Sequence, residues 1–126
     1  LAAQAASETV TPERIAYAGG SLWVTGRGKD LDRVDPATGD VLGTTEIGAA
    51  GIDVVAVGGR IVVFAATERG ARRGDPLVAS VVVVDPANGN VVARHDAGGP
   101  LSLLGFAQVR GKLALLDGLG GRVVLL

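Results

Sequence analysis

The sequence contains no cysteine and no methionine, and it has only one histidine, one tryptophan, one tyrosine and two phenylalanines. Without cysteine, disulfide bonds, thiolate metal sites and cysteine nucleophiles are all excluded. With so few aromatic rings, a core must be packed mainly from the Val, Leu, Ile and Ala within the 48% hydrophobic content. Function classes that depend on thiol chemistry are therefore ruled out.

The chain also lacks a large excess of either charge, because the formal net charge is −1. A surface for nucleic acid or anionic membrane needs a strong positive excess, so we expect neither partner. Gly, Arg or Asp interrupts every apolar run before membrane-spanning length, so direct membrane insertion is not expected. The chain begins without Met and shows no basic leader, so we interpret it as a piece of a longer protein. The preference for Arg over Lys is typical of a GC-rich bacterial genome.

What the sequence does contain is a repeated unit, clearest over residues 16–42 (AYAGGSLWVTGRGKDLDRVDPATGDVL). A second copy begins as VAVGGRIVVF at Val55 and ends as VVVVDPANGNVV, and a third begins as AQVRGKLALL at Ala107. In the first two copies, Gly-Gly joins two apolar runs, and glycine adopts the positive backbone angles of a tight hairpin. An Asp-Pro-x-x-Gly turn joins the next two runs, with Pro at the first corner and Gly left-handed. The unit therefore predicts four antiparallel strands.

The spacing between the two turns supports duplication. Gly20 precedes Asp35 by 15 residues and Gly59 precedes Asp85 by 26, so the second copy carries about 11 extra residues, in the stretch 67–78. The third copy ends where its Asp-Pro turn is expected, so we expect it to be incomplete. A period near 40 with four strands is typical of propeller blades rather than helical repeats.

The units resemble blades of the β-propeller superfamily that includes YVTN-type, NHL-type and pyrroloquinoline-quinone-type repeats. The residues that carry this resemblance are Gly-Gly-x-Leu-Trp-Val at 19–24, Val-Asp-Pro-x-Thr-Gly-x-Val at 34–41 and Val-Asp-Pro-x-Asn-Gly-x-Val at 84–91. The resemblance implies an all-β fold of tandem four-stranded antiparallel blades, about three here, at residues 13–50, 51–100 and 101–126. Such blades carry many unrelated activities, so the resemblance does not define a function.

Residues 1–12 leave three alternatives: a linker, a short helix, or a strand that completes another blade. The expected strands follow the repeat, and the wholly apolar run at Val81–Val84 predicts a strand covered on both faces. The strand ranges we expect are 14–18, 21–26, 32–35, 41–47, 53–57, 60–66, 79–85, 91–95, 103–109, 112–116 and 122–126, with junctions between blades at 48–51 and 97–100.

The loops between second and third strands are expected on one rim, where binding sites on rigid scaffolds usually lie. They collect the charged residues Arg27, Lys29, Asp30, Glu68, Arg69, Arg72, Arg73 and Asp75. The functional hypothesis is an anionic ligand or acidic partner held by Arg69, Arg72 and Arg73. The alternative, which we favour, is a solvated loop.

Two single residues, His95 and Trp23, each have a functional and a structural interpretation. His95, next to Asp96, could act as a general base or metal ligand, but no nucleophile or further ligand converges on it in the sequence. Trp23 could stack on a ligand, or fill the space between adjacent blades. We favour the structural interpretation of both, and predict no catalytic residue and no metal site.

Asp35-x-x-Thr38-Gly39 resembles the docking motif of quinoprotein dehydrogenases, which places a Trp four residues after the Gly. Gly43 stands there in this sequence. The quinone site is therefore not supported, and no cofactor is predicted.

The function that we expect is a non-enzymatic ligand-sensing or protein-interaction module of a larger bacterial protein, with an extracytoplasmic location as one hypothesis. A propeller enzyme fragment (hydrolase or lyase) with catalytic residues in other blades is an alternative, as is a structural self-assembly domain. Three blades do not close a ring, since rings usually have four to eight, and a lone wedge would leave strand edges open. Two alternatives follow: the natural protein supplies more blades, or copies of this chain associate, in which case two chains of three blades would complete a ring of six.

Overall fold

The computed structural model describes residues 12–26, 28–49, 51–66, 78–101, 103–110, 112–118 and 121–125. Every regular element among them is a β-strand, so the expected all-β fold class is confirmed. In the described part of the chain, no helix is long and apolar enough to cross a membrane. The strands are β1 Pro12–Ala18, β2 Ser21–Gly26, β3 Asp30–Val34, β4 Val41–Glu46, β5 Gly51–Val57, β6 Arg60–Ala66, β7 Val78–Val84, β8 Val91–Leu101, β9 Leu103–Val109, β10 Lys112–Asp117 and β11 Arg122–Leu125.

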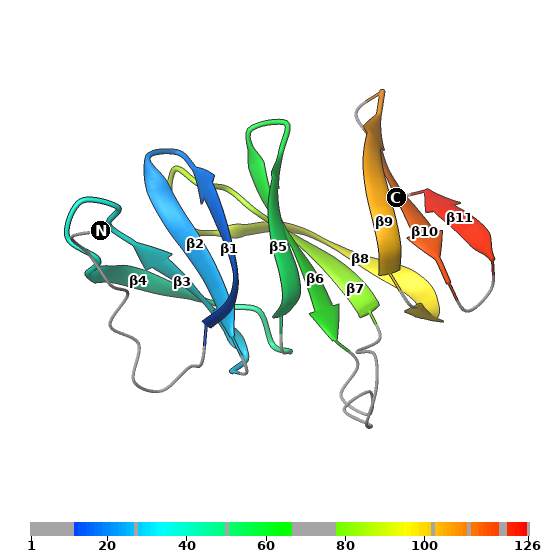
Figure 1. Ribbon diagram of the computed structural model, residues 1–126, viewed down its shortest axis with the longest axis horizontal. Helices are drawn as coiled ribbons and strands as arrows, with labels where there is room; N and C mark the ends of the chain where they lie inside the picture. Colours follow the sequence, from blue (N-terminus) through cyan, green and yellow to red (C-terminus); the bar gives the residue numbers. More distant parts are fainter. Residues whose placement is uncertain are drawn as a thin grey trace.

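The strands form three antiparallel sheets in which each strand pairs with the next along the chain. We call them blade 1 (β1–β4), blade 2 (β5–β8) and blade 3 (β9–β11). The first strands of the blades, β1, β5 and β9, follow one another across the molecule, and the first hairpin turn of each blade lies at the same end (Figure 1). The sequence repeat is therefore also a repeat in space.

The turns adopt the conformations that their residues favour. Gly19 and Gly20 have φ of 59° and 79°, the positive angles that a tight hairpin between twisted strands requires. The Asp35 carboxylate accepts a hydrogen bond from the Ala37 amide at 2.8 Å, and Gly39 closes that turn at φ 77°. Blade 2 repeats both turns with nearly the same angles. The two turn motifs thus direct the chain as the sequence predicted.

One expected junction is wrong. Residues 97–100 were predicted to leave the sheet, because two glycines and a proline stand there. Instead β8 continues to Leu101, which pairs with Val78 at the start of β7. The register shifts between Ser80, which pairs with Asp96, and Val78, so residues 97–100 form an irregularity within β8 rather than a junction between blades.

Each side of blade 2 belongs to a different hydrophobic core. Alternate residues of a strand point to opposite faces, so Ile61 and Val63 lie on one side and Val62 and Phe64 on the other. The first pair packs with Trp23 and Leu31 of blade 1. The second pair packs toward blade 3, with Leu115 and with the ring of Phe106, whose centroid lies 5.5 Å from that of Phe64. Blade 2 is thus the central layer, covered on both faces as the run Val81–Val84 predicted.

Candidate functional site

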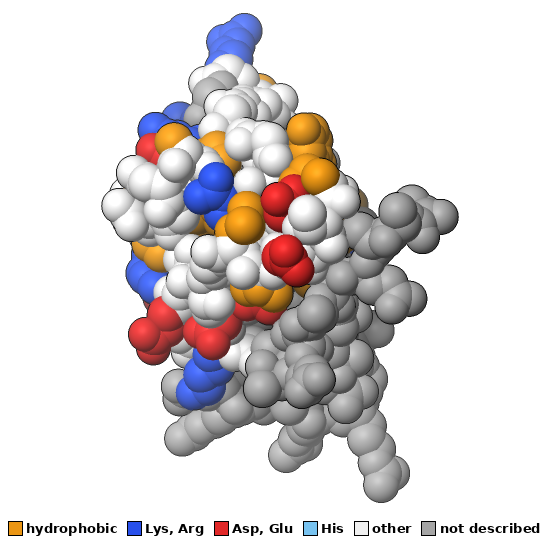
Figure 2. Space-filling view, turned by 90° about the vertical axis from the view of Figure 1, so that its left-hand side faces the viewer, with side chains coloured by type: hydrophobic (Ala, Val, Ile, Leu, Met, Phe, Trp, Pro, Cys, Tyr) orange, Lys and Arg blue, Asp and Glu red, His pale blue; other side chains and the backbone are white. Residues whose placement is uncertain are grey.

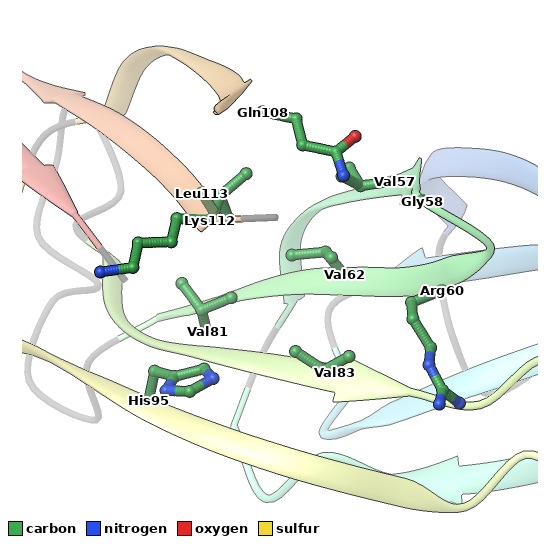
Figure 3. Close-up of a pocket in the computed structure, with 10 residues that line it drawn as sticks. All are labelled: Val57, Gly58, Arg60, Val62, Val81, Val83, His95, Gln108, Lys112 and Leu113. Atoms are coloured by element: carbon green, nitrogen blue, oxygen red, sulfur yellow. The ribbon is translucent and has the colours of Figure 1, made fainter. Parts of the chain in front are cut away.

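A pocket of about 300 Å³ lies between blades 2 and 3, at the end of the molecule that carries the first hairpin turns (Figure 3). Blade 2 provides its floor and blade 3 its opposite wall. The lining residues are Val57, Gly58, Arg60, Val62, Val81, Val83 and His95 from blade 2, and Gln108, Lys112 and Leu113 from blade 3.

The middle of the pocket is apolar. Val62 and Val83 are direct cross-strand partners on β6 and β7. With Val81 they form the central surface, and Leu113 approaches it from the side of blade 3 (Figure 3). Val62 and Val81 are only 5% and 1% exposed, so a flat hydrophobic group here would displace water mainly from Val83 and Leu113. Burial of apolar surface is favourable at about 25 cal/mol per Å².

Polar groups stand at both ends of the apolar middle. Arg60 lies at one end and His95 and Lys112 at the other, whereas the Gln108 amide lies over Val57 and Gly58 (Figure 3). Arg60 already forms an ion pair with Asp85, with Nη1 and Oδ2 3.1 Å apart. For Lys112 and His95, no ion pair is found among the residues that the structure describes. None of the described residues that line the pocket is Asp or Glu, so the end with Lys112 and His95 favours an anionic group.

The corresponding space between blades 1 and 2 is filled. Trp23 stands three residues after Gly20, as Val62 stands three after Gly59. Its side chain is fully buried, and its Nε1 donates a hydrogen bond to the Ala18 carbonyl at 3.0 Å. Arg33, the cross-strand partner of Trp23, lies over the ring at 5.8 Å from the centroid. An indole side chain therefore occupies in the first interface the space that is hollow in the second.

Further contacts close the first interface around Trp23. The Arg33 Nε donates to the Ser21 hydroxyl at 2.9 Å. Thr45 donates across the interface to the Gly89 carbonyl at 2.6 Å, and a Cβ added to Gly89 would lie 3.9 Å from the Trp23 ring. The positions that correspond to Ser21, Arg33 and Thr45 in blade 2 are Arg60, Val83 and His95, all of which line the pocket. The pocket thus arises from replacements within one repeated site.

The site residues predicted from the sequence are placed apart from one another. His95 is exposed on β8 and lines the pocket, whereas Trp23 is buried in the core between blades 1 and 2. Lys29 is exposed, and its carbonyl accepts hydrogen bonds from the Ile47 and Gly48 amides at 2.9 and 3.2 Å. Asp30 begins β3 opposite Glu46. The predicted residues Arg27, Arg69, Arg72 and Arg73 lie outside the described residues.

Sequence reasoning missed Arg60, Gln108 and Lys112, because it looked for a site on the opposite rim. A signal was present in the alignment of the repeats. The position three after the turn glycine holds Trp23, Val62 and Ala114 in the three copies. A large residue replaced by smaller ones at an interblade position indicates where packing is incomplete. In the described part of the chain, no three His, Cys, Asp or Glu residues are grouped as metal ligands.

The sequence matches no protein-family model and no curated protein. Similar solved structures do exist. The computationally designed Ika4 protein has a TM-score of 0.56 at 10% identity, over 100% of this chain and 96% of its own. Hydrazine synthase from Kuenenia stuttgartiensis has 0.61 at 12%, over 92% of this chain, and BBS1N in complex with ARL6DN has 0.62 at 14%, over 94%.

The chain has a propeller-like fold. The likeness to these structures, together with the three stacked antiparallel sheets, carries that conclusion. Identities of 10–14% show the fold alone. The chain spans 37% of the hydrazine synthase chain and 39% of the BBS1N chain, less than two thirds of either. The activity of this propeller-like chain must therefore be argued from its own pocket.

Proposed function

We propose that this propeller-like chain is a ligand-sensing module, and that the pocket between blades 2 and 3 binds a small molecule with a flat apolar body and one carboxylate. The observation that carries the proposal is the replacement of Trp23 in one interface by Val62 in the next, beside Lys112 and His95. The volume of about 300 Å³ is at the lower end for small-molecule sites, so the ligand is small.

The expected size of the apolar body follows from the repeat. The first interface shows that two blades of this protein can enclose an indole ring, which is fully buried there. At the second interface Val62 and Val83 provide a smooth floor without a ring of their own. An aromatic ring of the ligand would take the position of the missing side chain.

The expected charge of the ligand follows from the polar groups. Lys112 offers an ammonium and His95 an imidazole at one end of the apolar middle, and the lining residues that the structure describes include no carboxylate to compete. Arg60 contributes less, because Asp85 already compensates its charge. A charge-assisted hydrogen bond in a partly enclosed site is roughly twice as strong as a neutral one.

Isothermal titration calorimetry with indole-3-acetate tests the proposal, with neutral indole-3-acetamide as the matched probe. We expect the acetate to bind, and the acetamide to bind about tenfold more weakly, since a charge contact worth about 1.4 kcal/mol corresponds to that factor. Lys112→Gln should remove most of the difference between the probes. Val62→Trp should abolish binding, because its ring fills the pocket.

Arg110→Gln is the control, since it removes a neighbouring charge that does not line the pocket. It should bind both probes like the parent protein. Equal affinities for acetate and acetamide would remove the anion from the proposal. Binding that persists in Val62→Trp, with circular dichroism unchanged, would show that the probe binds elsewhere.

The basic loop at Arg69, Arg72 and Arg73, as part of a site for an anion or an acidic partner, remains a separate prediction. Replacement of all three by Ala, with titration of the same two probes, separates it from the pocket. Weaker binding in that variant, with normal binding in Lys112→Gln, would indicate that the probes bind at the basic loop and not in the pocket.

A further inference from the structure

A side-chain amide closes one end of the pocket, over the first hairpin turn of blade 2. Gln108 stands on β9 opposite Leu113, on the face of blade 3 that packs toward blade 2 through Phe106. Its amide nitrogen Nε2 would lie 2.9 Å from a Cβ added to Gly58, which has φ of 56°. A side chain on Gly58 would therefore push the amide away from the turn.

The corresponding place in the first interface carries no polar side chain. The position three before the turn glycine holds Gln108 in blade 3 and Ala56 in blade 2. The first hairpin turn of blade 1 is covered by a proline instead, because a Cβ added to Gly19 would lie 2.9 Å from the Cβ of Pro86. Gln108 is thus, like Val62, a residue by which the hollow interface differs from the filled one.

The Gln108 amide presents N–H donors at this end of the pocket. Among the residues that the structure describes, its side chain forms no hydrogen bond. Nε2 lies nearest the turn, whereas the amide oxygen points away from Val57 (Figure 3). Arg60, the cross-strand partner of Val57, brings a guanidinium to the same end, and a guanidinium has donors only. A ligand group placed here would therefore meet donors from both blades.

Charge outside the pocket is mixed. Figure 2 shows the side of the molecule on which blade 1 lies, with Lys and Arg side chains interspersed with Asp and Glu. The formal net charge of the whole chain is −1. A mixed surface gives little long-range preference between similar anions, so selection between them depends on the groups that touch the ligand.

We infer that Gln108 selects, among flat aromatic carboxylates, those with a hydrogen-bond acceptor such as a hydroxyl at the edge of the ring remote from the carboxylate. The inference rests on the proposed function, because it concerns the second end of the same ligand. The carboxylate would meet Lys112 and His95, the ring would cover the apolar middle, and the hydroxyl oxygen would accept from the Gln108 amide. A ligand without the acceptor would cover these donors and leave them unpaired, which lowers affinity.

Isothermal titration calorimetry with 5-hydroxyindole-3-acetate and indole-3-acetate tests the inference, because the two acids differ by one hydroxyl on the ring edge remote from the acetate. We expect the parent protein to bind the hydroxy acid about fivefold more tightly, as for one neutral hydrogen bond. Gln108→Met keeps the length of the side chain and removes the amide. This variant should bind both acids with the affinity that the parent shows for indole-3-acetate.

Two glycine variants of one turn provide a matched pair. Gly58→Ala places a Cβ where the Gln108 amide rests, so it should displace the amide and reduce the preference for the hydroxy acid. Gly59→Ala, at φ 75° with no atom within 4 Å of its added Cβ, strains the same turn without touching Gln108 and should keep the preference. Circular dichroism of each variant shows that its fold is retained.

Failure of the inference and failure of the proposed function give different results. Equal affinities of the parent protein for the two acids would overturn the inference and leave the proposed function intact. A preference that survives in Gln108→Met would assign the hydroxyl to another group, such as Arg60, and would also overturn the inference. Absence of binding for both acids would overturn the proposed function and the inference together.

Discussion

The two interfaces between blades differ in how they are closed, although both are built from the same repeat. Between blades 1 and 2, Trp23 fills the space and Arg33 covers its ring. Between blades 2 and 3, Val62 and Val83 take these positions and a pocket of about 300 Å³ remains. The same position of the repeat is therefore filled in one interface and hollow in the next, and a few side chains make the difference.

The first interface is also tied by polar contacts that cross it. Arg94 of blade 2 donates to the Ile47 carbonyl at 2.7 Å, and Arg14 lies 3.9 Å from the Asp53 carboxylate. A Cβ added to Gly19 would lie 2.9 Å from the Cβ of Pro86, so the outer turn of blade 2 packs closely on the first hairpin of blade 1. Close packing and directional bonds together hold blades 1 and 2 in one arrangement.

Among these substitutions, replacing Trp23 by Ala should lower stability most, because it removes the side chain that fills the first interface. We expect the free energy of unfolding to fall by about 3–5 kcal/mol, because the change leaves a large cavity in a fully packed interface. Val62→Ala is the matched variant and should cost only about 1–2 kcal/mol, since it removes two methyl groups beside an existing hollow. Urea denaturation measures both. Equal losses would show that the two interfaces contribute alike to stability.

Gly89→Ala should weaken the first interface through the outer turn of blade 2. Gly89 has φ of 75°, and an added Cβ would lie 3.2 Å from the Thr45 Oγ1. The left-handed conformation and this contact together should cost about 1–2 kcal/mol. Gly20→Ala, at φ 79° with no atom within 4 Å of its added Cβ, should cost less. Identical losses in thermal unfolding would mean that the turn does not support the interface.

Much of the fold follows from local sequence chemistry. Gly-Gly and Asp-Pro-x-x-Gly impose turns wherever they stand, so the strands on either side of Gly20 and Asp35 could be placed within two residues. The glycines at 98 and 99 were predicted to leave the sheet, but β8 continues through them to Leu101, which pairs with Val78 across a register shift. Local residue preferences therefore predicted the turns correctly but not the end of β8.

The candidate site was harder to predict, because it depends on residues from two blades. His95 was recognised as a polar residue at the end of a predicted strand, but nothing local connects it with Gln108 or Lys112. The three line one pocket only because blade 3 stacks on blade 2, with an offset that the sequence does not state. Val62 is smaller than Trp23 at the same position of the repeat. This difference indicates a hollow only when the copies are aligned and the residues packed against the position are known.

Val62→Trp should make the second interface resemble the first, because it places an indole at the position that Trp23 holds in blade 1. An indole at this position would fill the pocket and bury apolar surface, so we expect a gain of about 1 kcal/mol in the free energy of unfolding. Val92→Trp, on the exposed outer strand of blade 2, should leave stability nearly unchanged and serves as the control. A loss of stability in urea denaturation would mean that the pocket cannot take the ring without strain.

Thr45→Val should produce the smallest change, and it isolates one directional bond. Its hydroxyl donates to the Gly89 carbonyl at 2.6 Å, joining β4 to the outer turn of blade 2. Valine keeps the shape of the side chain and removes the donor, so the loss should be about 0.5–1 kcal/mol, as for a neutral hydrogen bond. Thr45→Ser keeps the hydroxyl and should retain most of the stability. If serine and valine lowered the unfolding midpoint equally, the methyl group of Thr45 would matter rather than its hydrogen bond. The first interface would then depend on packing alone, as the second does where Phe64 contacts Phe106.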